Sequence, residues 1–63
     1  MKFTQREIEV IKFCSQGLKD EEIAQQMNVT VSGVRKFITN MFVKTGTVNK
    51  PHLISWAFRN GVL

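Results

Sequence analysis

Residues 20–39 read DEEIAQQMNVTVSGVRKFIT, and this stretch predicts two helices joined by a tight turn. The acidic residues at its start suit the positive end of a helix macrodipole, and Asp20 is the expected N-cap of the first helix. Asn28 tolerates the left-handed conformation that ends a helix, so this helix should end at Met27. Thr30 is a good N-cap for the second helix. The segment therefore has the length and the punctuation of a helix-turn-helix unit.

The apolar residues of this segment also fit a helix-turn-helix template. Such a motif needs a small residue where the helices cross, a turn residue that accepts a positive φ, and apolar residues at fixed offsets. Seven positions fit when Asp20 is counted as the first: Ile23, Ala24, Met27, Asn28, Val29, Val34 and Phe37. These matches favour the motif over the alternative, an arbitrary pair of amphipathic helices with a tight turn.

The second helix of the motif, expected over about residues 31–44, has two distinct faces. Apolar residues recur at i, i+4, i+7 and i+8, which is the spacing of a face that packs on a core. They are Val34, Ile38, Met41 and Phe42. The other side carries Ser32, Arg35, Lys36, Thr39 and Val43.

Two further helices should flank the motif. Thr4 and Glu7 form a T-x-x-E capping box, which predicts the start of a first helix. Asn49 is a good N-cap for a last helix over about residues 50–60. No segment alternates apolar and polar residues as a half-buried strand does. We therefore predict an all-α, four-helix, single-domain fold over residues 1–63.

Charge is divided unevenly along the chain. The net charge is +4, but residues 1–28 carry four basic and five acidic side chains and sum to −1. Residues 29–63 carry five basic side chains and no acid. An acid-free basic half favours a face that binds a polyanion such as nucleic acid, and an ordinary solvated basic surface is the alternative.

Residues suited to catalysis or metal binding are scarce. The chain has one cysteine, Cys14, and one histidine, His52. A lone Cys in an apolar helical stretch behaves as a small hydrophobe, and one Cys with one His do not make a tetrahedral zinc site. No apolar run approaches the roughly 20 residues of a membrane span. We expect no enzyme activity, metal, cofactor, small-molecule ligand or membrane association, and a reducing, cytoplasmic setting.

Short motifs along the whole chain carry a family resemblance. They are Thr4-x-Arg6-Glu7-x-Glu9-Val10, Gly17-Leu18, Glu22-Ile23-Ala24, Thr30, Ser32, Val34-Arg35, Asn40, Lys44, Gly46, Ala57 and Gly61. With these residues the sequence resembles the DNA-binding domain of the LuxR/GerE transcription factors, which include response regulators and quorum-sensing regulators. The resemblance runs through the chain without a gap and implies a four-helix helix-turn-helix domain.

Several residues depart from the usual pattern of that family. Gly33 stands inside the expected recognition helix where Thr is usual, and Phe37 replaces a usual His. Lys19 stands where a Ser or Thr cap is common. Lys50 occupies the position of an Arg that often pairs with the Glu matched here by Glu7. These departures predict a divergent member of the family.

The resemblance implies that the helix at about residues 31–44 enters the major groove of DNA. It matches Arg35, Lys36 and Thr39 to positions that often face base edges, and all three lie opposite the core stripe. Because arginine can bind guanine through two hydrogen bonds, we assign Arg35 the main base-reading role. Contacts of Arg35 and Lys36 to phosphates alone are the alternative. The candidate phosphate contacts are Thr30, which is also a cap, and Ser32, Asn40 and Lys44.

The last helix has a wide apolar arc. Leu53, Ile54, Trp56, Ala57 and Phe58 cover roughly 200° of its circumference, which is more than one packing face usually shows. In the resembled family, the last helix commonly forms the dimer contact. We therefore expect a homodimer surface around Leu53 and Trp56, with packing of Trp56 onto its own core as the alternative.

The leading hypothesis is a sequence-specific binder of double-stranded DNA that acts in transcriptional regulation, as a homodimer at least on DNA. Two alternatives are a protein-interaction module on the same fold that no longer reads DNA, and a non-specific nucleic-acid binder. The expected location is cytoplasmic, and nucleoid-associated when the domain is bound to DNA.

Overall fold

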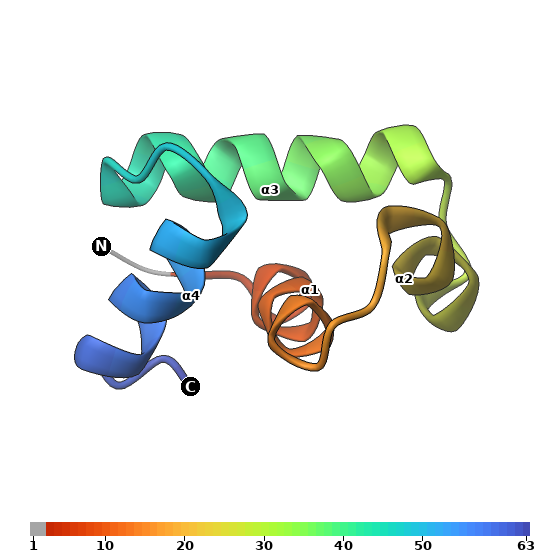
Figure 1. Cartoon of the computed structure of the whole chain (residues 1–63). Helices are drawn as coiled ribbons and strands as arrows, with labels where there is room; N and C mark the ends of the chain where they lie inside the picture. The colour runs from red at the N-terminus through yellow and green to blue at the C-terminus, as the bar shows by residue number, and fades with distance from the viewer. Residues whose placement is uncertain (1–2) are drawn as a thin grey trace.

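The computed structural model describes residues 3–63, which form four helices and no strand. The helices are α1 (Gln5–Ser15), α2 (Asp20–Met27), α3 (Val31–Thr45) and α4 (Lys50–Arg59). The longest helix, α3, lies along one side of the molecule, and the other three pack against its inner face (Figure 1). The all-α, four-helix architecture is therefore confirmed. None of these four helices is long and apolar enough to cross a membrane.

Three helix starts are capped as the sequence predicts. At α1, the Glu7 N–H donates to the Thr4 hydroxyl at 3.1 Å, and the Thr4 N–H donates to the Glu7 carboxylate at 2.8 Å. At α3, the Thr30 hydroxyl accepts a hydrogen bond from the Gly33 N–H at 3.0 Å. The Asn49 side chain caps α4 in the same way. Each bond satisfies an amide that has no partner within its own helix.

The start of α2 differs from the prediction. Its N-cap is Lys19 rather than Asp20, and Lys19 has the extended dihedral angles φ −79° and ψ 162°. A lysine side chain has no acceptor to offer a helix amide, and the Lys19 N–H itself donates to the Glu22 carboxylate at 2.8 Å. The prediction that Asp20 caps the helix was wrong because its carboxylate bonds cations of two other helices.

The turn between α2 and α3 has the geometry that the motif requires. Asn28 adopts the left-handed conformation, with φ 56° and ψ 47°. The Val29 N–H then donates to the Ala24 carbonyl at 3.0 Å, which closes the end of α2. Ala24 is buried, as expected of a small residue where two helices cross.

One face of each helix contributes to the core. Six of its side chains are essentially inaccessible to solvent: Val10, Ile11, Ile23, Val34, Met41 and Leu53. Phe42, which was expected in the core stripe of α3, is only half-buried and packs at the edge of the core. Its position is rotated toward the flank of the helix, where the neighbouring helices do not cover it fully.

Candidate nucleic-acid interface

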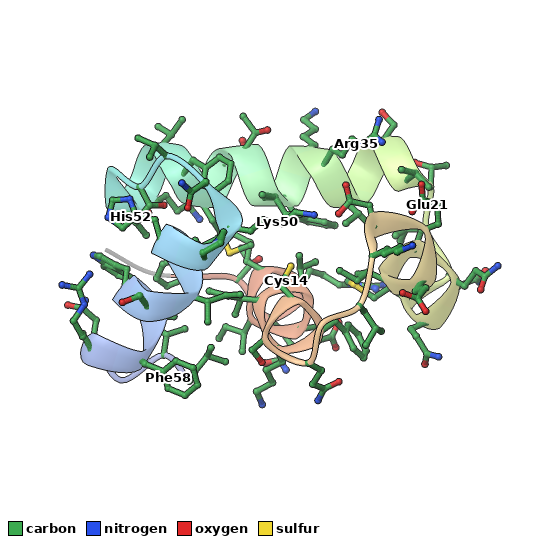
Figure 2. The ribbon with its side chains drawn as sticks, in the orientation of Figure 1. Cys14, Glu21, Arg35, Lys50, His52 and Phe58 are labelled. Atoms are coloured by element: carbon green, nitrogen blue, oxygen red, sulfur yellow. The ribbon has the colours of Figure 1, made fainter. Side chains whose placement is uncertain are left out.

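The side of α3 that faces away from the other helices carries most of the candidate contact residues. We call it the outer face of α3 and define it by five exposed residues: Ser32, Lys36, Thr39, Asn40 and Val43. Side chains along this edge project away from the rest of the molecule (Figure 2). A helix whose far side is open along its length can enter the DNA major groove, which is about 12 Å wide.

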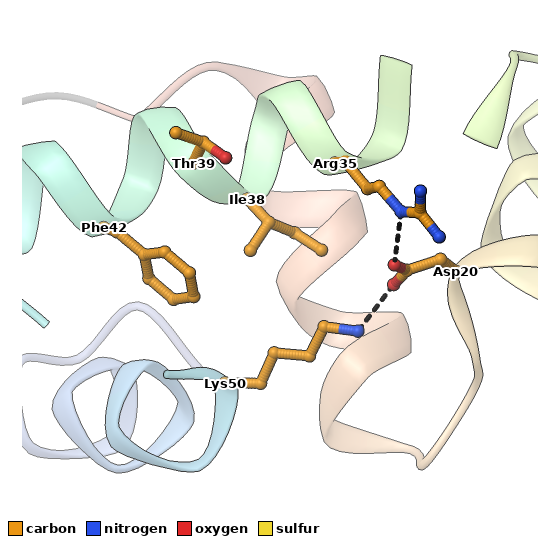
Figure 3. Close-up of a pocket in the computed structure, with 6 residues that line it drawn as sticks. All are labelled: Asp20, Arg35, Ile38, Thr39, Phe42 and Lys50. Atoms are coloured by element: carbon orange, nitrogen blue, oxygen red, sulfur yellow. Dashed lines mark hydrogen bonds and ion pairs between the residues drawn. The ribbon is translucent and has the colours of Figure 1, made fainter. Parts of the chain in front are cut away.

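Arg35 lies on the flank of α3, between the outer face and α2. Its side chain is 67% exposed, and its Nε donates to Oδ2 of Asp20 at 3.4 Å. The other oxygen of Asp20, Oδ1, accepts from Nζ of Lys50 at 2.5 Å. The two bonds join α2, α3 and α4 at a shallow pocket (Figure 3). The pocket has a volume of about 260 Å³, and its other lining residues are Ile38, Thr39 and Phe42.

Asp20 is the fixed member of this network. Its side chain is 15% exposed, far less than that of Arg35. The Lys50 ammonium has the largest effect on the pKa of Asp20 and lowers it below its ordinary value, with a further lowering by Arg35, against the opposing effect of burial. Its place in the first turn of α2 is also favourable for a negative charge. A carboxylate is therefore held beside the predicted base-reading residue at neutral pH.

Lys44, a candidate phosphate contact, is engaged with α1. Its Nζ lies 2.6 Å from Oε1 of Glu7, whose side chain is only 3% exposed, whereas that of Lys44 is 31% exposed. The ammonium also lies 5.7 Å from the centre of the Phe3 ring. Burial raises the pKa of Glu7, but the hydrogen bonds and charge of Lys44 and the bonds from Thr4 outweigh it, so the pKa is lowered overall. A DNA phosphate would share this ammonium with a buried carboxylate.

The other three phosphate candidates are accessible, two on α3 and one at its N-cap. Thr30, Ser32 and Asn40 are all exposed. The Thr30 hydroxyl accepts the Gly33 N–H, and a hydroxyl that accepts one bond can donate another. Near Thr30 and Ser32, an anion would meet the positive end of the α3 dipole.

The two residues expected at a dimer surface have different environments. Leu53 is 1% exposed and belongs to the core, so it has almost no surface to offer a partner. Trp56 is half-buried, and its ring meets that of Phe3 edge-on, with centroids 5.7 Å apart and planes inclined by 62°. Trp56 therefore packs partly on its own chain. Phe58, near the end of α4, is exposed (Figure 2).

The pairing of acids with cations is the part of the site that the sequence does not reveal. Lys50 occupies a position linked by resemblance to the partner of Glu7, yet it bonds Asp20, and Lys44 bonds Glu7. These pairs join residues that are 30 and 37 positions apart in the chain. The uneven charge distribution is the available signal, because acids of the first half and cations of the second half meet across the fold.

The chain matches the family model described as bacterial regulatory proteins, luxR family, over residues 1–57. The response regulator Rre1 of Synechocystis sp. is 40% identical over 60 residues, which cover 95% of this chain and 26% of that protein. The probable transcriptional regulator ycf29 of Cyanophora paradoxa is 33% identical over 61 residues, which cover 97% of this chain and 29% of that protein. The uncharacterized transcriptional regulatory protein YxjL of Bacillus subtilis is 31% identical over 61 residues, which cover 97% of this chain and 28% of that protein. The chain thus spans between a quarter and a third of the length of these relatives.

Proposed function

The chain belongs to the luxR family of bacterial regulatory proteins, and we propose that its helix α3 enters the major groove of DNA to read the sequence. The family and the regulators among its relatives support sequence-specific DNA binding in transcription regulation. The observation that carries this proposal is the outer face of α3, which is exposed along the helix and has no acidic side chain. The opposite face of the same helix packs on the core. Such a rigid element positions contact residues more accurately than a loop does.

The proposed base contacts are Lys36 and Thr39 of this outer face and Arg35 on the flank beside it. The guanidinium of Arg35 can donate to O6 and N7 of guanine, and the methyl group of Thr39 can contact the thymine methyl. Contacts to phosphates position a protein on the duplex without reading its sequence. Those proposed contacts are Thr30, Ser32, Asn40 and Lys44.

Selection and titration of duplexes test this function. The wild-type chain selects sequences from a pool of duplexes with a randomised centre, and the selected duplex is titrated beside a scrambled one at several salt concentrations. We expect tighter binding of the selected duplex and a log affinity that falls linearly with log salt, because bound counterions are released. Steep salt dependence without sequence preference would indicate a non-specific nucleic-acid binder. Absence of binding at low salt would leave a protein-interaction module as the function.

The domain is also proposed to form a homodimer on DNA through α4. Because Leu53 is buried, the surface that supports this proposal reduces to the exposed part of Trp56 and to Phe58. Two recognition helices related by a two-fold axis would meet half-sites about 34–36 Å apart. Sedimentation with the selected duplex should show two chains per duplex for the wild type and one for Trp56→Ala. One wild-type chain per duplex would exclude pairing.

The proposed role involves no catalysis, metal, cofactor or small-molecule ligand, and the proposed location is the cytoplasm, on the nucleoid when DNA is bound. The relatives described above carry the names of regulators.

Cys14 is buried, and this burial raises the pKa of its thiol, which makes it a poor nucleophile. His52 Nδ1 accepts a hydrogen bond from the Val48 N–H at 3.3 Å, a contact that orders the start of α4.

A further inference from the structure

Arg35 is joined to Asp20 through Nε, the guanidinium nitrogen nearest to its aliphatic stem (Figure 3). An end-on, two-bond contact with guanine uses the other two nitrogens, Nη1 and Nη2. A carboxylate that accepts from Nε can therefore orient the guanidinium without occupying the atoms that would meet the base. This arrangement differs from a two-bond Arg–carboxylate pair, in which a second nitrogen is also taken.

We propose that Asp20 is a positioning residue for sequence recognition, which holds the guanidinium of Arg35 in the orientation that meets a guanine edge. This inference rests on the proposed function, because it takes Arg35 as a base-reading residue. It extends that function by adding a residue of α2 that lies outside the proposed contact surface.

The surroundings of Asp20 make it suitable as an anchor. Its side chain is largely buried, and Lys50 of α4 holds Oδ1 at 2.5 Å while Oδ2 bonds Arg35. Its backbone is part of the first turn of α2, which is fixed by the bond from the Lys19 N–H to Glu22. The anchor thus connects α3 to two other helices, and Lys50 holds it through an oxygen that Arg35 does not use.

Arg35 itself needs such an anchor. Its side chain is 67% exposed, and a long exposed side chain loses much rotamer freedom when it is immobilised on a ligand. A tether at Nε removes part of that freedom before DNA arrives. A two-bond guanine contact depends on the plane of the guanidinium, whereas a phosphate accepts it in many orientations. The tether therefore favours base reading over phosphate binding.

The negative charge of Asp20 acts in the same direction. A carboxylate beside the recognition helix repels phosphates. It therefore weakens binding to any duplex in which no favourable base contact offsets this repulsion. Both ion-pair partners of Asp20 are exposed, Arg35 at 67% and Lys50 at 42%, and pairs with such exposed partners contribute little to folding. Removing the Asp20 carboxylate should therefore change selectivity more than it changes stability.

The test uses the full chain, the duplex selected by the wild type, and a copy of it with one base pair exchanged. The exchanged base pair contains the guanine whose preference decreases most in Arg35→Ala. In the wild type this preference should be about 5- to 150-fold. Asp20→Ala should reduce that preference by about 2- to 12-fold, the factor for ordering one long side chain, and should bind the scrambled duplex at least as tightly as the wild type. Asp20→Asn keeps an acceptor for Nε and should recover part of the preference.

Glu21→Ala is the matched control. Glu21 is an exposed acid in the same turn of α2 (Figure 2). Its removal should raise affinity for every duplex without changing the preference at the exchanged base pair. A purely structural role for Asp20 would instead weaken binding to the selected and exchanged duplexes by the same factor.

Several outcomes would overturn the positioning role. One is an unchanged preference in Asp20→Ala; should that variant not fold, an unchanged preference in Asp20→Asn has the same meaning. Another is a further loss of preference at the same base pair when Asp20→Ala is added to Arg35→Ala. A sequence-specific wild type whose preferences all survive Arg35→Ala overturns the positioning role but not DNA binding. A wild type without any sequence preference overturns the proposed function itself.

Discussion

Among residues 3–63, two ion pairs attach α3 to other helices, and they differ in how far they are removed from water. In the outer pair, Arg35 meets Asp20 of α2 at 3.4 Å, and the arginine side chain is 67% exposed. In the inner pair, Lys44 meets Glu7 of α1 at 2.6 Å, and the glutamate side chain is 3% exposed. The inner pair fixes one end of α3 to the fold, whereas the outer pair leaves most of a guanidinium in solvent.

The difference teaches that the cations of the basic half are not equivalent. Both Arg35 and Lys44 are candidates for DNA contacts, and both have an acidic neighbour. Separating a cation from a nearly buried carboxylate is costly, because the carboxylate is left without a counter-charge. The partners of an exposed pair can replace their contact by contacts with water at little cost. We therefore infer that Lys44 acts first in folding and Arg35 first in recognition.

The largest expected effect comes from breaking the inner pair. Glu7→Gln should lower the free energy of unfolding by about 1–3 kcal/mol, because Lys44 loses its counter-charge in a half-buried site. Arg35→Gln, which breaks the outer pair and leaves the Lys50 bond to Asp20 in place, should cost less than about 1 kcal/mol. Urea unfolding followed by circular dichroism measures both. Equal losses would show that the two pairs do not differ as their exposure indicates.

Acid should weaken the fold through the same carboxylates. The pKa values of Glu7 and Asp20 both lie below their ordinary values of 4.5 and 3.8. Their stabilising contribution is therefore complete above those ordinary values and is lost as the pH falls through them toward the lowered native values. The urea midpoint of the wild type should decrease below about pH 4.5. Glu7→Gln should show a shallower decrease, and a parallel decrease would contradict this role of Glu7.

Much of the fold can be predicted because its signals are local. The capping box of Thr4 and Glu7 and the cap of Thr30 span four residues each, so tertiary packing is not needed to identify them. The left-handed Asn28 is equally a property of a single residue and its neighbours. Asp20 shows where this reasoning fails. Its neighbours in the sequence predict a helix cap, but its carboxylate bonds Arg35 and Lys50, which are distant in the chain.

The depth of side chains on α4 illustrates a second reason for failure. The apolar arc of this helix is visible in the sequence, but the part that meets the core depends on how α4 is rotated against α1 and α3. That rotation places Leu53 inside and leaves Phe58 exposed, with Trp56 between these extremes. A periodic pattern identifies an apolar surface, and only packing decides which part remains for a partner.

The two pairs should also differ in their effect on DNA binding. Lys36→Ala removes an exposed cation from the outer face of α3 and should reduce the slope of log affinity against log salt by about 1. Lys44→Ala should weaken all duplexes by a similar factor and reduce the slope by less, because Glu7 already neutralises part of this charge. Titrations of the selected and scrambled duplexes across salt test both. A full reduction in slope for Lys44→Ala would mean that DNA displaces Glu7.

The smallest expected effect concerns Gly33, in the first turn of α3. Alanine there improves helix formation by about 0.5–1 kcal/mol. Its Cβ, however, would lie 3.2 Å from the Thr30 hydroxyl oxygen, which caps the helix. Because Thr30 is exposed, its hydroxyl can move slightly and weaken the cap, which leaves a net stabilisation below about 0.5 kcal/mol.

Gly46→Ala is the control for Gly33→Ala in thermal unfolding. Gly46 ends α3 with φ 72°, a conformation that costs alanine about 1–2 kcal/mol. Alanine should therefore stabilise the chain slightly at Gly33, in the first turn of α3, and destabilise it at Gly46, which ends the helix. A loss of stability in Gly33→Ala would show that the Thr30 hydroxyl cannot move. The start of α3 would then be as rigidly packed as its other end, where Lys44 bonds Glu7.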